Sequence, residues 1–201
     1  MTERHEVKTV TDLMDNSGIA PRFENATFQS FKPVNAAGAH CLDICQTFAQ
    51  SWDERLKAGD GLILCGRTGT GKTHLACAIA RDVIENHRAE AFITTAQRII
   101  RAFRRTWNHK SEHTEDEAIR FYTTRDLLII DEVGVQYGTD AERNILFEVI
   151  NTRYEFLLPT ILISNFTDVE LAEFLGERTL DRMTQGGAVL AFDWESQRRS
   201  V

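Results

Sequence analysis

Five short apolar runs divide the chain, and amphipathic stretches separate most of them. The runs cover residues 62–65, 91–94, 127–130, 160–163 and 188–192. Each run except the last is followed by apolar residues at intervals of three and four, the spacing of an amphipathic helix. Strands that are apolar on both faces and alternate with helices are typical of a parallel sheet covered on both sides. The pattern therefore predicts an α/β fold.

Helix boundaries are marked in three places. Apolar residues at helical spacing predict a helix over residues 39–56, which Gly59 and the aspartate after it should end. Capping boxes that begin at Thr139 and Thr167 predict two later helix starts. Residues 1–20, by contrast, form a polar arm without clear periodicity. We expect the main domain to occupy residues 21–201.

Composition narrows the class of protein. The chain has 201 residues, 42% of them hydrophobic and 26% charged, which is ordinary for a globular domain. It contains no apolar run long enough for a membrane span, and its charged start is unlike a secretory signal, so we expect a cytoplasmic protein without a membrane partner. The net charge of −7 argues against a generally basic surface, so any contact with nucleic acid should be local.

The four cysteines favour buried thiols. Cys41 and Cys45 have a spacing that half a metal site can use, but no second Cys or His pair follows at ligand spacing. Cys65 and Cys77 lie on apolar segments. We therefore interpret all four as core residues.

The stretch GLILCGRTGTGKTHLA contains a phosphate-binding loop where a predicted strand turns into a predicted helix. Its glycines let backbone N–H groups converge on phosphate oxygens, and the following helix adds its positive dipole end. We expect Lys72 to contact the β- and γ-phosphates of ATP and Thr73 to bind Mg²⁺. The predicted nucleotide-binding residues are Gly66, Thr68, Gly69, Thr70, Gly71, Lys72, Thr73 and His74.

Two acidic residues end the third apolar run, in the sequence DLLIIDEVG. Ligands of open parallel sheets collect at the carboxyl ends of strands, so Asp131 is placed to hold Mg²⁺ and Glu132 to polarise a water for attack on the γ-phosphate. A solvated strand end is the simpler alternative. A kinase for a small metabolite needs no such glutamate, whereas a hydrolytic ATPase does.

The fourth run ends in TILISN, where Asn165 fits two interpretations equally well. Its amide can hydrogen-bond the γ-phosphate and the attacking water, or the residue can simply start the turn into the helix that begins at Thr167.

Several segments together resemble the bacterial DnaC family of replicative helicase loaders, which are AAA+ ATPases. They are GRTGTGKTHLA, LLIIDEVGVQ, ISN, GERTLDRM and FDWESQRRSV. The resemblance implies a P-loop NTPase of AAA+ type with a five-stranded parallel sheet and little or no helical lid. It also implies an ATPase that uses ATP and Mg²⁺, self-associates into an open ring or spiral, and loads a DnaB-type replicative helicase onto single-stranded DNA. The related IstB-like helpers of transposition, which act on duplex DNA, share part of this pattern.

The resemblance also assigns roles to single residues. Asn165 takes the sensor-1 role, and Arg182 matches the arginine finger that reaches the ATP of a neighbouring subunit, with Arg178 one helical turn earlier. Arg198 falls at the sensor-2 position. The alternative for Arg178 and Arg182 is ordinary surface pairing with neighbouring acidic residues. The alternative for Arg198 is a plain basic tail. The catalytic set implied is Lys72, Glu132, Asn165 and Arg182.

The start of the chain departs from this family. The loaders carry a larger amino-terminal helicase-binding domain, whereas only about twenty residues precede GIAPRF here. We therefore expect that domain to be shortened or absent, which leaves the identity of the helicase partner open.

A basic stretch, TTAQRIIRAFRRTWNHK, follows the second apolar run. On a helix, Arg98, Arg101 and Arg105 share one stripe, and Trp107 lies at its end. Cations beside an aromatic ring suit single-strand binding, and the predicted DNA-binding residues are Arg101, Arg104, Arg105 and Trp107. A solvated basic face answered by the acidic segment SEHTEDEA is the alternative.

The adenine pocket is not defined by the sequence. Phe23, Phe28 and Phe31 either line it or pack the amino-terminal segment on the core, and aromatic residues more often pack. A nucleotide-dependent adaptor that does not hydrolyse ATP also fits the sequence.

Overall fold

A single parallel sheet forms the centre of the protein. The computed structural model describes residues 8–107, 114–135 and 139–197. Its strands pair in the order β2-β3-β4-β1-β5, and every pair is parallel. The strands are β1 Leu62–Gly66, β2 Ala91–Thr95, β3 Leu127–Val133, β4 Thr160–Ser164 and β5 Ala188–Phe192. All five predicted strands are therefore confirmed.

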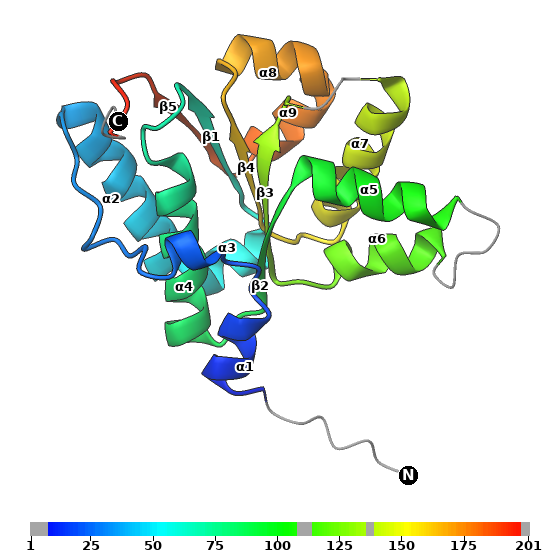
Figure 1. The fold of residues 1–201 in the computed structure, drawn as a ribbon, viewed down its shortest axis with the longest axis horizontal. Helices are drawn as coiled ribbons and strands as arrows, with labels where there is room; N and C mark the ends of the chain where they lie inside the picture. The colour runs from blue at the N-terminus through cyan, green and yellow to red at the C-terminus, as the bar shows by residue number, and fades with distance from the viewer. Residues whose placement is uncertain (1–7, 108–113, 136–138, 198–201) are drawn as a thin grey trace.

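Helices cover both faces of the sheet (Figure 1). One face carries α1 Val10–Asp15, α2 Ala36–Gln50, α3 Trp52–Ala58 and α4 Lys72–His87, with the short 3₁₀ helix η1 Pro21–Phe23 in the connecting segment. The other face carries α5 Ala96–Thr106, α6 Glu115–Thr123, α7 Asp140–Glu155, α8 Asp168–Leu175 and α9 Glu177–Thr184. After β5 the described residues, 193–197, contain no helix.

Each strand face builds a separate apolar core. Leu62 and Leu64 of β1 join the cluster beneath α2 and α4, whereas Ile63 and Cys65 join the cluster beneath α5 and α7. Because successive side chains of a strand point to opposite faces, a strand buried on both sides must be apolar throughout. This is why the sequence shows continuous apolar runs.

The helix predicted over residues 39–56 is in fact two helices. The Ser51 hydroxyl donates to the carbonyl of Thr47 at 2.7 Å, and Ser51 ends α2 before α3 begins at Trp52. A local side-chain hydrogen bond of this kind competes with the helix backbone. The end at Gly59 is confirmed, since this residue closes α3 with φ 74°. The capping boxes at Thr139 and Thr167 are confirmed as well.

Residues 8–20 of the amino-terminal arm form more structure than their sequence predicts. Thr9 closes a capping box at the start of α1, Leu13 is buried in the core, and the N–H of Ile93 donates to the carbonyl of Ser17 at 2.8 Å. Lys8 pairs with Glu90. A six-residue helix is too short to show periodicity, so its order comes from these contacts.

Arg153 of α7 is buried beneath the amino-terminal ends of β3 and β4. Its guanidinium donates to the Thr160 hydroxyl and to four backbone carbonyls, at distances from 2.7 to 3.3 Å. The carbonyls belong to Tyr122, Arg125, Asp126 and Pro159. One side chain thus provides hydrogen-bond donors for the backbone carbonyls in the connections that precede two central strands.

None of the helices among the described residues is long and apolar enough to cross a bilayer.

The four cysteines are buried, as the sequence predicts, and each is a free thiol. Burial raises the pKa of Cys41 to about 11 and that of Cys77 to about 12, because a thiolate is poorly solvated there. The thiolate is the reactive form of cysteine. At about pH 8 we therefore expect iodoacetamide to alkylate the thiols of the folded protein at least about 100-fold more slowly than those of the unfolded protein. Mass spectrometry of timed aliquots measures this, and rapid labelling of the folded protein would contradict the buried placement.

Candidate nucleotide site

The phosphate-binding loop runs from the end of β1 into α4. Gly66, Gly69 and Gly71 have φ values of 111°, 81° and 103°, in the left-handed region that favours glycine. A Cβ on Gly69 would lie 2.1 Å from the Ser196 hydroxyl, so the carboxyl-terminal segment also closes against the loop. Lys72 is buried, and its Nζ donates to the carbonyls of Gly66 and Arg67 at 2.7 Å each.

A cleft of about 350 Å³ opens above this loop, at the carboxyl ends of β1, β3 and β4. It is lined by Thr68, Gly69, Gly71, Lys72, Thr73, His74, Asp131, Glu132, Ile163 and Asn165, together with Arg22, Phe23 and Gln197. The structure thus brings most of the predicted nucleotide residues to one place. This is the end of an open parallel sheet where ligands bind.

Thr73 and Asp131 meet although they lie far apart in the sequence. The Thr73 hydroxyl donates to Oδ2 of Asp131 at 2.9 Å. Burial raises the pKa of Asp131, while hydrogen bonds from Thr73 and from the N–H of Glu132 and the charge of Lys72 oppose that shift. Both groups offer the oxygen ligands that Mg²⁺ prefers, so the pair fits that ion. Among the described residues no cluster of three His, Cys, Asp or Glu forms a metal site, so phosphate oxygens would supply further ligands.

Glu132 sits on a β-bulge that the sequence does not predict. The register of β3 against β4 passes from Ile130 opposite Leu162 to Val133 opposite Ser164, so β3 contains one extra residue. Glu132 adopts φ 58°, a left-handed conformation that costs about 1–2 kcal/mol for a residue with a Cβ. Its side chain is exposed in the cleft. Bulges often re-aim side chains beside active sites, and here the bulge turns Glu132 toward the cleft.

The amino-terminal segment closes one side of the cleft. Nε2 of His74, in the first turn of α4, lies 2.9 Å from the Thr27 carbonyl oxygen and 3.2 Å from the Ser30 hydroxyl. The three phenylalanines of this segment do not share one role. Phe28 and Phe31 are buried in the core, whereas Phe23 lines the cleft beside Arg22.

Two predicted nucleotide residues that the structure describes, Gly66 and Thr70, are not among the residues that line the cleft. The Gly66 N–H donates to the Phe166 carbonyl at 2.8 Å. The Thr70 side chain is buried and donates to the Arg67 carbonyl at 2.7 Å, inside the loop. Arg198 lies outside the described residues.

Comparisons with known proteins agree with this geometry. The profile of the family described as IstB-like ATP binding protein matches residues 19–200. The replicative helicase loader DnaC of Escherichia coli (strain K12) is 30% identical over 188 residues, which cover 93% of this chain and 75% of the relative. The chain belongs to the DnaC/IstB-like ATP-binding family.

Solved structures agree on the fold. The crystal structure of the DnaC helicase loader matches with a TM-score of 0.77 at 22% identity, covering 86% of this chain and 99% of that one. The replication initiator DnaA, bound to AMPPCP and single-stranded DNA, matches with a TM-score of 0.70 at 21% identity, covering 86% and 51%. The predicted AAA+ type of P-loop fold is confirmed.

In this DnaC/IstB-like protein, α9 lies away from the cleft. The Arg182 guanidinium stacks 5.1 Å from the ring centre of Tyr154, and its Nη1 is buried without a hydrogen-bond partner. Arg182 faces the amino-terminal ends of β1 and β4, beside Gly59 and Thr160. Arg178, one turn earlier, is exposed. Neither arginine touches the nucleotide cleft of its own chain.

Arg104 of the basic helix α5 makes an ion pair that the sequence does not predict. Nη2 of Arg104 donates to Oε1 of the buried Glu142 at 2.9 Å, so this arginine holds α5 against α7. A DNA phosphate would have to compete with Glu142 for the Arg104 guanidinium. Arg101 and Arg105 are exposed, as is the side chain of Trp107.

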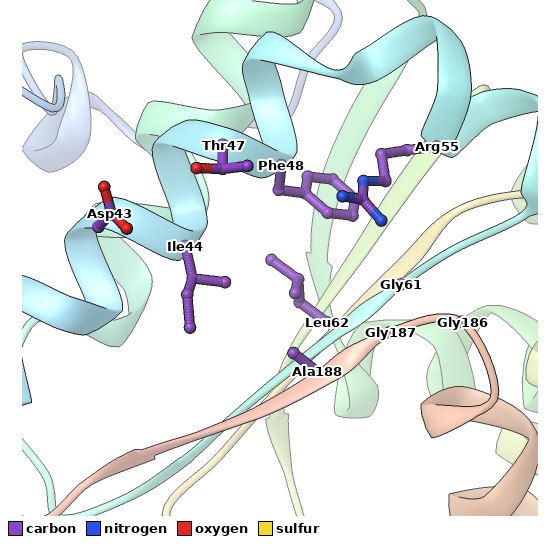
Figure 2. A pocket seen from close by; sticks show the side chains of 10 residues that line it. All are labelled: Asp43, Ile44, Thr47, Phe48, Arg55, Gly61, Leu62, Gly186, Gly187 and Ala188. Carbon is purple, nitrogen blue, oxygen red and sulfur yellow. The ribbon is translucent and has the colours of Figure 1, made fainter.

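A second cavity, of about 300 Å³, lies at the amino-terminal ends of β1 and β5 (Figure 2). Ile44 and Phe48 of α2, Leu62 and Ala188 give it apolar walls, and Arg55 beside it is paired with Asp60 at 2.9 Å. No predicted site residue lines this cavity. It lacks a loop of converging N–H groups, so the polar cleft above β1 is the better place for a triphosphate.

Proposed function

We propose that this protein is an ATP-dependent loader of a replicative DnaB-type helicase onto single-stranded DNA, working in the cytoplasm. The observation that carries the proposal is the 2.9 Å contact between Thr73 and Asp131 in a cleft that also holds Glu132. This contact joins the phosphate loop to the acidic strand end, as magnesium-dependent ATP hydrolysis requires.

The chain's own groups divide the work of hydrolysis. N–H groups of the loop bind phosphate oxygens, and Lys72 exchanges its two carbonyl partners for the β- and γ-phosphates. Thr73 and Asp131 would hold Mg²⁺, which would supply positive charge against the transferred phosphoryl group. Glu132 accepts a proton from the attacking water, and Asn165, exposed at the end of β4, orients that water.

Assembly completes the site in this proposal. The arginines of α9 lie outside their own cleft, so a finger acting on ATP belongs to the neighbouring subunit. Head-to-tail contacts of this kind build an open ring or spiral. The exposed Arg178 reaches a neighbour without rearrangement, whereas Arg182 has to leave Tyr154 first.

We assign the helicase partner from the similarity to DnaC, and the single-stranded DNA from the exposed arginines of α5. DnaC is a replicative helicase loader, and residues 21–201 form the corresponding ATPase domain in our proposal. The exposed arginines of α5 would follow the phosphates of a single strand. Residues 1–20 would face the helicase.

Phosphate release at a series of protein concentrations, with and without DNA, tests the proposal. We expect the rate per subunit to rise at least tenfold, roughly, with concentration or with single-stranded DNA, because a finger in trans contributes far more than this. A flat rate across the series would contradict assembly. Stronger stimulation by duplex DNA would favour the second candidate, an IstB-like transposition helper, which the family match also supports.

A further inference from the structure

We propose that the cavity between α5 and α6 receives one base of the single strand and that Phe121 is the ring on which the base stacks. The inference rests on the proposed binding of single-stranded DNA and adds a base-contacting residue that lies outside the basic stretch.

The cavity has a size and lining that suit a flat aromatic ligand. Its volume is about 250 Å³, and its walls are Ala102, Thr106, Ala118, Phe121 and Tyr122, with Arg105 and Glu117 as its charged members. Ala102 of α5 and Ala118 of α6 both line the cavity, and their small side chains leave space between the two helices. The space is open to solvent and mainly apolar, so a group with an apolar face gains by entering it.

Phe121 is exposed yet held in one orientation. Its side chain is 42% exposed, which is unusual for a phenylalanine. Phe92 and Tyr122 pack against it nearly at right angles, with ring centres 5.2 and 5.1 Å away. The Arg125 guanidinium lies 4.9 Å from its centre and is itself held by Glu90 at 2.7 Å. A ring fixed by such contacts loses little conformational freedom when a ligand stacks on it.

Positive charge lies directly beside the cavity. Arg98, Arg101 and Arg105 are exposed on α5, and none of their guanidinium groups makes an ion pair or a hydrogen bond with another described residue. Arg105 is also part of the cavity wall. Nucleic acid combines a chain of phosphates with flat apolar bases, and this surface combines a row of cations with an aromatic wall.

The carboxylate of Glu117 is compatible with a base. Its Oε2 accepts the N–H of Thr114 at 2.9 Å in a capping box, which directs it toward the start of α6. A protein ligand with an apolar side chain would fill the cavity too, but it would leave the arginine row without anions. The charge next to the cavity therefore favours nucleic acid.

Fluorescence anisotropy with a labelled thymidine homopolymer, and with the same strand carrying abasic sites, tests this inference. We expect the wild-type protein to bind the strand with bases about tenfold more tightly, since stacking on one aromatic side chain contributes at this level. Phe121→Leu keeps the apolar volume but removes the π-face, and it should lower affinity for the base-bearing strand to that for the abasic one. Phe121→Tyr should bind like wild type.

The matched control is Phe156→Ala, because Phe156 is 70% exposed at the end of α7, outside the cavity. It should change neither affinity. Thermal melting of Phe121→Leu shows that a lost affinity does not reflect unfolding. Equal wild-type affinity for the two strands, or a Phe121→Leu protein that still distinguishes them, would overturn the base pocket and leave the loader proposal intact. Absence of any binding to single strands would overturn both.

Discussion

Replacing Glu132 with glutamine is expected to lower kcat for ATP hydrolysis by at least about 100-fold while ATP affinity changes by less than about threefold. General-base catalysis contributes about 10²–10⁴-fold to a rate, and the amide cannot accept the proton of the attacking water. The substitution keeps the size of the side chain, so the bulge and the neighbouring Asp131 remain in place. Phosphate release and equilibrium titration with a fluorescent ATP analogue measure the two quantities separately.

Glu173→Gln on α8 is the control for this experiment, because Glu173 is exposed and does not line the cleft. It should hydrolyse ATP like the wild type. A Glu132→Gln protein with an undiminished rate would show that another group activates the water, and the solvated strand end would then be the correct interpretation of Glu132.

Arg153→Ala is expected to lower the free energy of unfolding by about 3–5 kcal/mol. The substitution removes a buried guanidinium that donates to four carbonyls and to the Thr160 hydroxyl. The Pro159 carbonyl keeps the N–H of Leu128 as a donor, but the other acceptors lose the Arg153 donor, and each unsatisfied buried group costs about 1–3 kcal/mol before the site relaxes. Urea denaturation followed by circular dichroism measures the change.

Arg143→Ala is the matched control, since it removes an arginine from the same helix. Arg143 pairs with Asp140 on the surface, and exposed pairs contribute at most about 1 kcal/mol. If both variants lost the same small amount of stability, Arg153 would not hold the connections before β3 and β4.

The sequence predicts the sheet and the phosphate loop well because both depend on local pattern. A buried parallel strand has to be apolar on both faces, and a loop that wraps phosphate has to be rich in glycine. The meeting of Thr73 with Asp131 also follows from the rule that parallel strands end at one edge of the sheet.

Features that depend on contacts between distant segments could not be predicted from the sequence. The bulge under Glu132 arises from the pairing of β3 with β4, and the pair between Arg104 and Glu142 arises from the packing of α5 on α7. Neither has a local signal. The break at Ser51 had a weak one, a serine within a helical pattern. Phe23 was separable from Phe28 and Phe31 only once the path of the segment was known.

The contacts between His74 and the segment at Thr27 and Ser30 have a mechanical consequence. The segment starts beside β2, where Ile93 bonds to Ser17, and it ends at the first turn of the phosphate-loop helix. A pulling force applied to the amino-terminal arm would be transmitted through this segment to α4, because the segment is hydrogen-bonded to the domain at both of its ends. A body attached there would therefore act directly on the first turn of α4, the turn to which our proposal assigns phosphate binding.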